Sequence, residues 1–223
     1  MIQCRARHSW NLEPKQAVAL QNSLAGELVL RPMSRAVGAM AGIDISVKGD
    51  RAHAAVVVLS YPSLEEIERR TAIAKVTYPY IPGLLTFREA PVALQALAEL
   101  STWPDLFMFD GQGYAHPRRL GLASHLGLVL DTPAIGCAKS RLCGTYEAPA
   151  LERGSWSPLI DDEQVIGAVV RTRTAVSPVY VSAGHLTDLQ QAIQFVLNTY
   201  RGYRLPEPTR QAHRLSTQWP ERQ

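Results

Sequence analysis

A block of three alternating segments constrains the fold more than any other part of this sequence. In residues 37–47 every second position is apolar, and Asp44 belongs to the other set of positions, together with two glycines, a methionine and a serine. This period of two is that of a β-strand with two different faces. Residues 53–60 and 66–77 have strand-like patterns after short connections. Consecutive strands joined in this way pair antiparallel, so we expect a three-stranded meander.

A strand signal of a different kind lies at residues 106–109, where Leu, Phe, Met and Phe form a continuous apolar run. A short run of this kind is typical of a strand that is buried on both faces. Asp110 stands where the run ends, and Gly111 and Gly113 allow the backbone to approach a ligand. A buried carboxylate requires a partner, usually a cation. We therefore expect a functional site at the end of this strand.

The rest of the chain alternates between helical and strand patterns. This layout predicts an α/β fold, with a central mixed sheet of five or more strands that contains the meander and is flanked by helices. Residues 156–162 are expected to form an exposed loop. Residues 1–223 are expected to form a single domain, with a basic C-terminal extension from about residue 201. Helical spacing is seen in residues 14–28, 92–100, 120–130 and 187–200, and further strand patterns in residues 134–138, 165–170 and 179–181.

Three acidic residues can meet in such a fold. Asp44 lies on the first strand and Asp110 at the end of the fourth, so the two carboxylates meet near the sheet centre if these strands are neighbours. Glu89 is expected at the beginning of the helix that follows the meander, and it can reach the same point from one sheet face. An isolated Glu in a first helical turn is otherwise explained by the helix dipole.

Composition excludes some classes of protein and favours others. No run of about 18 apolar residues is present, so we expect no membrane span. The first residues have no apolar run of a secretory signal. Cys4, Cys137 and Cys143 lack the spacing of a zinc site and are expected to be reduced thiols of a cytoplasmic protein. The net charge of +3 is only mildly basic, but arginines gather after residue 201, either as a phosphate-facing surface or as a solvated tail.

The segment 78–83 reads Tyr-Pro-Tyr-Ile-Pro-Gly. Its two prolines exclude a helix or a central strand, because proline has no N–H and its φ angle is fixed. We therefore expect a stiff loop that displays Tyr80 and Ile81. Two interpretations remain open: an aromatic plug over the core, or a wedge that enters a stack of nucleic-acid bases.

Four motifs together resemble the endonuclease V family, over roughly residues 10–215. The resemblance implies a ribonuclease H-like fold and a Mg²⁺-dependent endonuclease that nicks DNA at deaminated bases, chiefly deoxyinosine, at the second phosphodiester bond on the 3′ side. Some relatives prefer inosine in RNA. One departure is Ile-Asp-Ile around Asp44, where Val-Asp-Val is common, and residues 147–163 suggest no site. The motifs are Gly42-Ile43-Asp44-Ile45-Ser46, Tyr-Pro-Tyr-Ile-Pro-Gly-Leu-Leu-Thr-Phe-Arg-Glu at 78–89, Asp-Gly-Gln-Gly-Tyr-Ala-His-Pro-Arg at 110–118 and Gly-Cys-Ala-Lys-Ser at 136–140.

The resemblance implies roles for five catalytic residues. Asp44 and Asp110 would be direct ligands of Mg²⁺, for which Mn²⁺ can substitute, because carboxylate oxygens suit these cations. Glu89 would be the third acid, as ligand of a second metal about 4 Å from the first or as the partner of a bound water. Lys139 would hold the scissile phosphate. His116 would orient water or contact phosphate, with a charge change near pH 6.5.

Further residues would contact the nucleic acid. Tyr80, with Ile81 beside it, would enter the duplex where the altered base leaves the stack. The backbone at Gly83 and Gly111 would approach that base. The other expected contacts are Arg88, which pairs with an acid or a phosphate, Lys139, and His213, which is similar to a family position near the active site; His125 is expected to be structural.

The expected partner is thus DNA with deaminated bases. The protein is expected to be a monomer and to have no membrane partner. Two alternatives remain. Another ribonuclease H-like nuclease, such as a junction resolvase or a transposase-type enzyme, does not require the loop at 78–83. A non-catalytic nucleic-acid-binding module would not require Asp44, Glu89 and Asp110.

Overall fold

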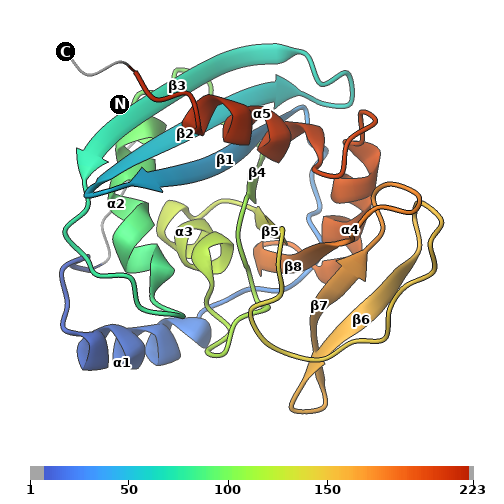
Figure 1. The fold of residues 1–223 in the computed structure, drawn as a ribbon, viewed down its shortest axis with the longest axis horizontal. Helices are drawn as coiled ribbons and strands as arrows, with labels where there is room; N and C mark the ends of the chain where they lie inside the picture. The colour runs from blue at the N-terminus through green and yellow to red at the C-terminus, as the bar shows by residue number, and fades with distance from the viewer. Residues whose placement is uncertain (1–7, 221–223) are drawn as a thin grey trace.

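A computed structural model of the protein describes residues 8–220, which form one eight-stranded sheet with helices on both faces (Figure 1). The prediction of an α/β fold with a mixed sheet of five or more strands is confirmed. The elements in chain order are α1 (Pro14–Ala25), β1 (Ala39–Lys48), β2 (Arg51–Ser60), β3 (Glu66–Lys75), α2 (Leu85–Ala98), β4 (Leu106–Phe109), α3 (Leu122–Leu130), β5 (Ala134–Ala138), β6 (Trp156–Asp161), β7 (Gln164–Val170), β8 (Val179–His185), α4 (Leu189–Asn198) and α5 (Glu207–Ser216).

The sheet has the strand order β3-β2-β1-β4-β5-β8-β7-β6. Strands β1, β2 and β3 pair antiparallel, as the meander predicted. Strand β1 also pairs with β4, in parallel, and this register sets Ile43 beside Phe109. Each of these two residues is followed directly by an acid, Asp44 or Asp110. The condition for the acids to meet, that their strands are neighbours, is therefore fulfilled.

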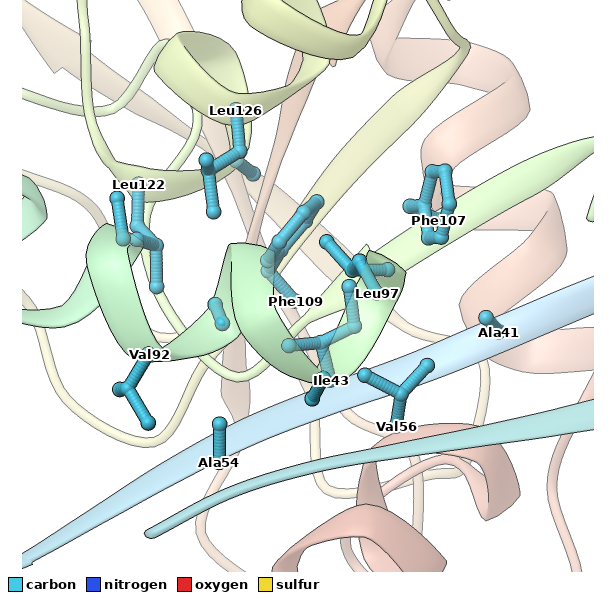
Figure 2. Packing of buried hydrophobic residues seen from close by; sticks show 14 of the residues in the cluster. Ala41, Ile43, Ala54, Val56, Val92, Leu97, Phe107, Phe109, Leu122 and Leu126 are labelled. Carbon is cyan, nitrogen blue, oxygen red and sulfur yellow. The ribbon is translucent and has the colours of Figure 1, made fainter. Parts of the chain in front are cut away.

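The central strand β4 is buried on both of its faces. Phe107 and Phe109 point into a cluster with Ile43 and the helices α2 and α3, which Figure 2 shows. Leu106 and Met108 belong to a second cluster on the opposite face, under α4 and α5. Because successive side chains of β4 point to opposite faces of the sheet, this strand contributes to both clusters. Each large apolar side chain buried in this way stabilises the fold by about 1.5–3 kcal/mol.

The expectation of an exposed loop at residues 156–162 is wrong. Trp156–Asp161 forms β6, which pairs antiparallel with β7 at the edge of the sheet. Leu159 is buried, whereas Trp156 and Ile160 are exposed apolar residues, so the usual contrast between an apolar and a polar face is missing. Pro158 also argues against a strand, but an edge strand tolerates proline because it has no second neighbour to bond.

The C-terminal segment contains a helix that the periodicity did not predict. Helix α5 packs on β1 and β2, and its buried side consists of small or polar residues such as Thr209, Ala212 and Ser216. The helix can lie this close to the sheet because residue 42 is a glycine, at which a Cβ atom would stand 1.9 Å from the Pro208 carbonyl oxygen. Arg222 lies outside the described residues.

Two expectations from composition concern the cysteines and the membrane. Cys137 and Cys143 are free thiols, and Cys4 lies outside the described residues. Among residues 8–220, no helix combines the length and the apolar character that a membrane crossing needs.

Candidate active site

Three elements bring the acidic residues together. Asp44 lies on β1 and Asp110 directly follows β4, where its backbone N–H donates to the Ile43 carbonyl at 2.9 Å. Helix α5 adds His213 from the other end of the chain. One ligand atom from each of Asp44, Asp110 and His213 lies within 4.8 Å of the others, which is a grouping suited to a metal ion.

The pKa values of Glu89 and Asp110 show that these two acids are crowded and shielded from water. Burial, followed by Asp44 and Asp110, raises the pKa of Glu89 to about 8. Burial and Asp44 also raise the pKa of Asp110 to about 7, against the opposing effect of Lys139. Carboxylates held together in a dry site repel one another, and a divalent cation among them removes that repulsion. The donor set, hard carboxylate oxygens with one imidazole, fits Mg²⁺ or Mn²⁺.

Glu89 reaches this site from within α2, not from its first turn. The helix begins at Leu85, so Glu89 lies one turn further along than expected. The helix dipole therefore does not account for an acid at this position. Helix α2 also continues through Pro91.

Two cationic or basic side chains bridge the acids. Lys139 Nζ lies 2.5 Å from Asp110 Oδ2 and 3.1 Å from His213 Nδ1. His213 Nδ1 lies 3.3 Å from Asp44 Oδ2. Lys139 follows β5, the parallel neighbour of β4, and so enters the site at the same end of these two strands as Asp110. The site thus gathers four of the residues named from the sequence around one point.

His116 has a different environment from the one expected. Its Nδ1 accepts from the Arg118 backbone N–H at 3.1 Å, so Nε2 carries the proton and donates to the Gly83 carbonyl at 3.0 Å. Burial, followed by the charge of Arg118, lowers the pKa of His116 to about 4. The expected charge change near pH 6.5 is therefore wrong, because the imidazole is neutral there. A catalytic role for His116 stays a prediction.

The loop at residues 78–83 has neither helix nor strand, as expected, and it is fixed at both ends. Arg88 donates to the Tyr78 carbonyl at 3.0 Å. At the other end Gly83, with φ +78°, presents its carbonyl to Gln21, His116 and Arg118. The positive φ favours glycine at this position.

The two tyrosines of this loop separate the two interpretations that were open. Tyr78 is buried and stacks on Phe87, with ring centroids 5.6 Å apart, so it is the aromatic plug. Tyr80 is 71% exposed and covers no core. Ile81 is half-buried against the cluster that contains Phe87 and Ala17. The loop therefore presents one aromatic ring to solvent on a rigid base.

A cavity of about 330 Å³ lies between this loop and the acids. Its size is that of a small-ligand pocket. The wall combines the loop with the acidic site, and it includes Tyr80, Gly83, Asp110, Gly111, His116 and Lys139.

Some residues of the site have no signal in the sequence. Ser216 donates a hydrogen bond to Asp44 Oδ2 from the last turn of α5. Gln21 is fully buried in α1 and bonds both Gly83 and Arg118. A lone serine in a basic segment and a lone glutamine in an amphipathic helix carry no pattern; only the positions of their distant partners reveal them.

The raised pKa of Glu89 predicts how stability depends on pH in the metal-free protein. Between about pH 4.5 and 8 the folded state holds a proton that the unfolded state has lost, so the free energy of unfolding falls as pH rises, by up to about 1.4 kcal/mol per pH unit for one proton. Thermal unfolding between pH 5 and 8 should show this fall. Glu89→Gln stays neutral throughout, so its slope should be shallower. Equal slopes for the two proteins would contradict the burial of this proton.

The fold and the site define a class of protein. Acids on a central strand and at the end of its parallel neighbour, with a third acid from a helix over the sheet, form the arrangement of a ribonuclease H-like nuclease. Within that class, the chain belongs to the endonuclease V family, whose family model matches residues 22–214. Members of this family are nucleases, hydrolases that act on DNA, and the protein is one of these enzymes.

Relatives and solved structures cover nearly the whole chain. Endonuclease V of Methanothrix thermoacetophila is 55% identical over 212 residues, 95% of this chain and 94% of the relative. The crystal structure of endonuclease V from Streptomyces avermitilis has 41% identity and a TM-score of 0.88, over 93% of this chain and 92% of that one. Endonuclease V of Ciona intestinalis, solved in complex with a 24mer DNA containing an inosine followed by a ribo-adenosine, has 28% identity and a TM-score of 0.80, over 91% of this chain and 95% of that one.

Proposed function

We propose that this protein is a Mg²⁺-dependent endonuclease that acts on deaminated bases and nicks the strand at the second phosphodiester bond 3′ to deoxyinosine. The observation that carries the proposal is the convergence of Asp44, Asp110 and Glu89 beside a cavity that Tyr80 also lines. The inosine-containing DNA bound by the Ciona intestinalis relative supports the substrate.

In the proposed reaction, Asp44 and Asp110 hold the cation, and Glu89 binds a second one or a water. When bound, the cation activates a water and neutralises charge that develops on the phosphate. Lys139, which is ion-paired with Asp110 in the free protein, turns its ammonium to the scissile phosphate. His213 lies close enough to Asp44 to be a further ligand. Because their pKa values are raised in the free protein, Glu89 and Asp110 would release protons in order to hold the cation or a water bound to it.

The altered base is proposed to enter the cavity while Tyr80 takes its place in the stack. The Gly83 carbonyl already accepts from three side chains, so recognition at this residue falls to its N–H group. A backbone N–H can donate to the carbonyl oxygen of hypoxanthine, whereas the amine that adenine carries there is a donor itself. Gly111, which lines the same cavity, offers backbone without a side chain in the way. Arg88, engaged with Tyr78, steadies the loop and keeps further N–H groups for a phosphate.

We further propose that the enzyme acts on DNA as a monomer in the cytoplasm, with inosine in RNA as the alternative substrate. The intact group of acids favours this proposal over a non-catalytic binding module. The loop that displays Tyr80 favours it over other ribonuclease H-like nucleases.

A matched cleavage comparison tests the proposal. Oligonucleotides of one sequence, with a single inosine in single- or double-stranded DNA or RNA, are incubated with Mg²⁺ or with a chelator. We expect a nick in the inosine-bearing DNA at the second bond 3′ to the lesion, and none with the chelator or with unmodified DNA. Preferential cleavage of the RNA would mean that RNA, not DNA, is the main substrate. Cleavage in the presence of chelator would refute the metal site.

A further inference from the structure

The carboxylate of Asp44 is held from one side by the end of helix α5. Ser216, fully buried in the last turn, donates to Asp44 Oδ2, and His213 Nδ1 lies 3.3 Å from the same oxygen. Neither contact uses the other oxygen, Oδ1. The last turn of α5 therefore fixes the rotation of a side chain that lies among the candidate metal ligands.

The end of α5 is in turn attached to the sheet by three residues, His53, Ser46 and Trp219, which we call the C-terminal latch. His53 and Ser46 are partners in the register of β2 and β1, so they share the face on which Asp44 lies. Burial lowers the pKa of His53, and the backbone of Ser216 beside it opposes that effect. Its ring also meets the ring of Trp219 edge to face, with centroids 5.5 Å apart.

Trp219 connects the latch to β1. Its Nε1 donates to Ser46 Oγ at 2.9 Å, two residues from Asp44 on the same strand. The chain that leaves α5 is thus bonded to the strand that carries the metal ligand. A displacement of α5 would move Ser216 away from Asp44 Oδ2.

We propose that Ser216 is a positioning residue for the metal site, and that the C-terminal latch holds it in place. The hydroxyl of Ser216 restrains Asp44 so that the carboxylate presents its other oxygen to the cation before the cation binds. A hydrogen bond to one oxygen of a ligating carboxylate commonly changes metal affinity by about 10- to 100-fold. This inference rests on the proposed function, because it assumes that Asp44 is a metal ligand.

The test measures Mn²⁺ binding to the full chain without nucleic acid, by electron paramagnetic resonance of the free ion. We expect Ser216→Ala to weaken binding about 10-fold or more. Thr217→Ala is the matched control, because Thr217 also has a hydroxyl at the end of α5 but bonds only the carbonyls of His213 and Arg214. Its affinity should equal that of the wild type.

The latch is tested by two milder variants, which keep the proposal testable if the Ser216→Ala protein does not fold. Ser46→Ala and Trp219→Phe each remove the bond between Trp219 and β1 while the aromatic packing on His53 remains. We expect each to weaken Mn²⁺ binding about 3- to 10-fold. Lower melting temperatures with unchanged Mn²⁺ affinity would mean that the latch is merely structural, and would overturn its part of the proposal.

The outcomes separate this inference from the function on which it rests. If the wild type and Asp44→Asn bind Mn²⁺ equally, Asp44 is not a ligand and the proposed function fails with it. If Asp44→Asn loses binding while Ser216→Ala binds like the wild type, only the positioning role fails. Equal losses in Ser216→Ala and Thr217→Ala would also overturn it, because they would indicate a general effect on the helix end.

Discussion

Asp110→Asn is expected to reduce nicking of an inosine-containing strand by about 1,000-fold or more, equivalent to about 4 kcal/mol in the activation free energy. The variant keeps the shape of the side chain but removes a charge that the cation requires. Affinity for the lesion should stay measurable, because Tyr80 and the rest of the cavity wall are unchanged. Single-turnover cleavage and equilibrium binding in Mg²⁺, measured on the same duplex, distinguish the two effects.

Asp105→Asn is a suitable control for the loss of an acid next to β4. Asp105 lies at the opposite end of this strand, where its carboxylate accepts from the backbone N–H groups of Gly38 and Ala39. Its replacement should lower stability without changing the rate of the chemical step. Cleavage by Asp110→Asn at the wild-type rate would remove Asp110 from the metal site.

The second large effect is expected for Tyr80→Ala, which should weaken binding to a lesion-bearing duplex by about 5- to 150-fold, the effect of losing one stacked base contact worth about 1–3 kcal/mol. Binding to unmodified duplex should change little, because a well-paired base does not leave the stack. The folded protein should be unaffected, since the side chain is 71% exposed. Fluorescence anisotropy with matched duplexes at one salt concentration provides the comparison.

Two further variants sharpen this comparison. Tyr80→Phe keeps the ring and should bind nearly as the wild type does. Tyr203→Ala removes another exposed tyrosine, which packs on Arg210 away from the cavity, and should not discriminate between the duplexes. Equal losses on lesion-bearing and unmodified DNA for Tyr80→Ala would count against the wedge.

The parts of this fold that could be predicted from the sequence are those in which pattern and burial agree. The alternation around Asp44 and the apolar run before Asp110 have one physical explanation each, and both strands were predicted. Helix α4 was predicted from its helical spacing, and in the structure Asp188 is its N-cap and accepts from the Gln191 N–H. The register that brings Asp44 beside Asp110 depends on which distant strands pair. The sequence indicated only that the two acids would meet if their strands were neighbours.

The errors have physical causes as well. Strand β6 was missed because Trp156, Pro158 and Ile160 give its outer face the apolar character of an inner one. Helix α5 was missed because its buried side is made of small and polar residues that fit over Gly42. The environment of His116 could not be predicted, because its pKa depends on Arg118 and on burial by a distant loop.

The triple attachment of the Gly83 carbonyl has a consequence for the speed of recognition. A loop that orders only upon contact loses conformational entropy at that moment, which weakens association. Here Gln21, His116 and Arg118 impose that order during folding. Under the proposed function, Tyr80 would therefore meet the duplex with its loop already ordered. The rate at which a damaged pair opens spontaneously, a property of the nucleic acid, would then govern how often an encounter succeeds.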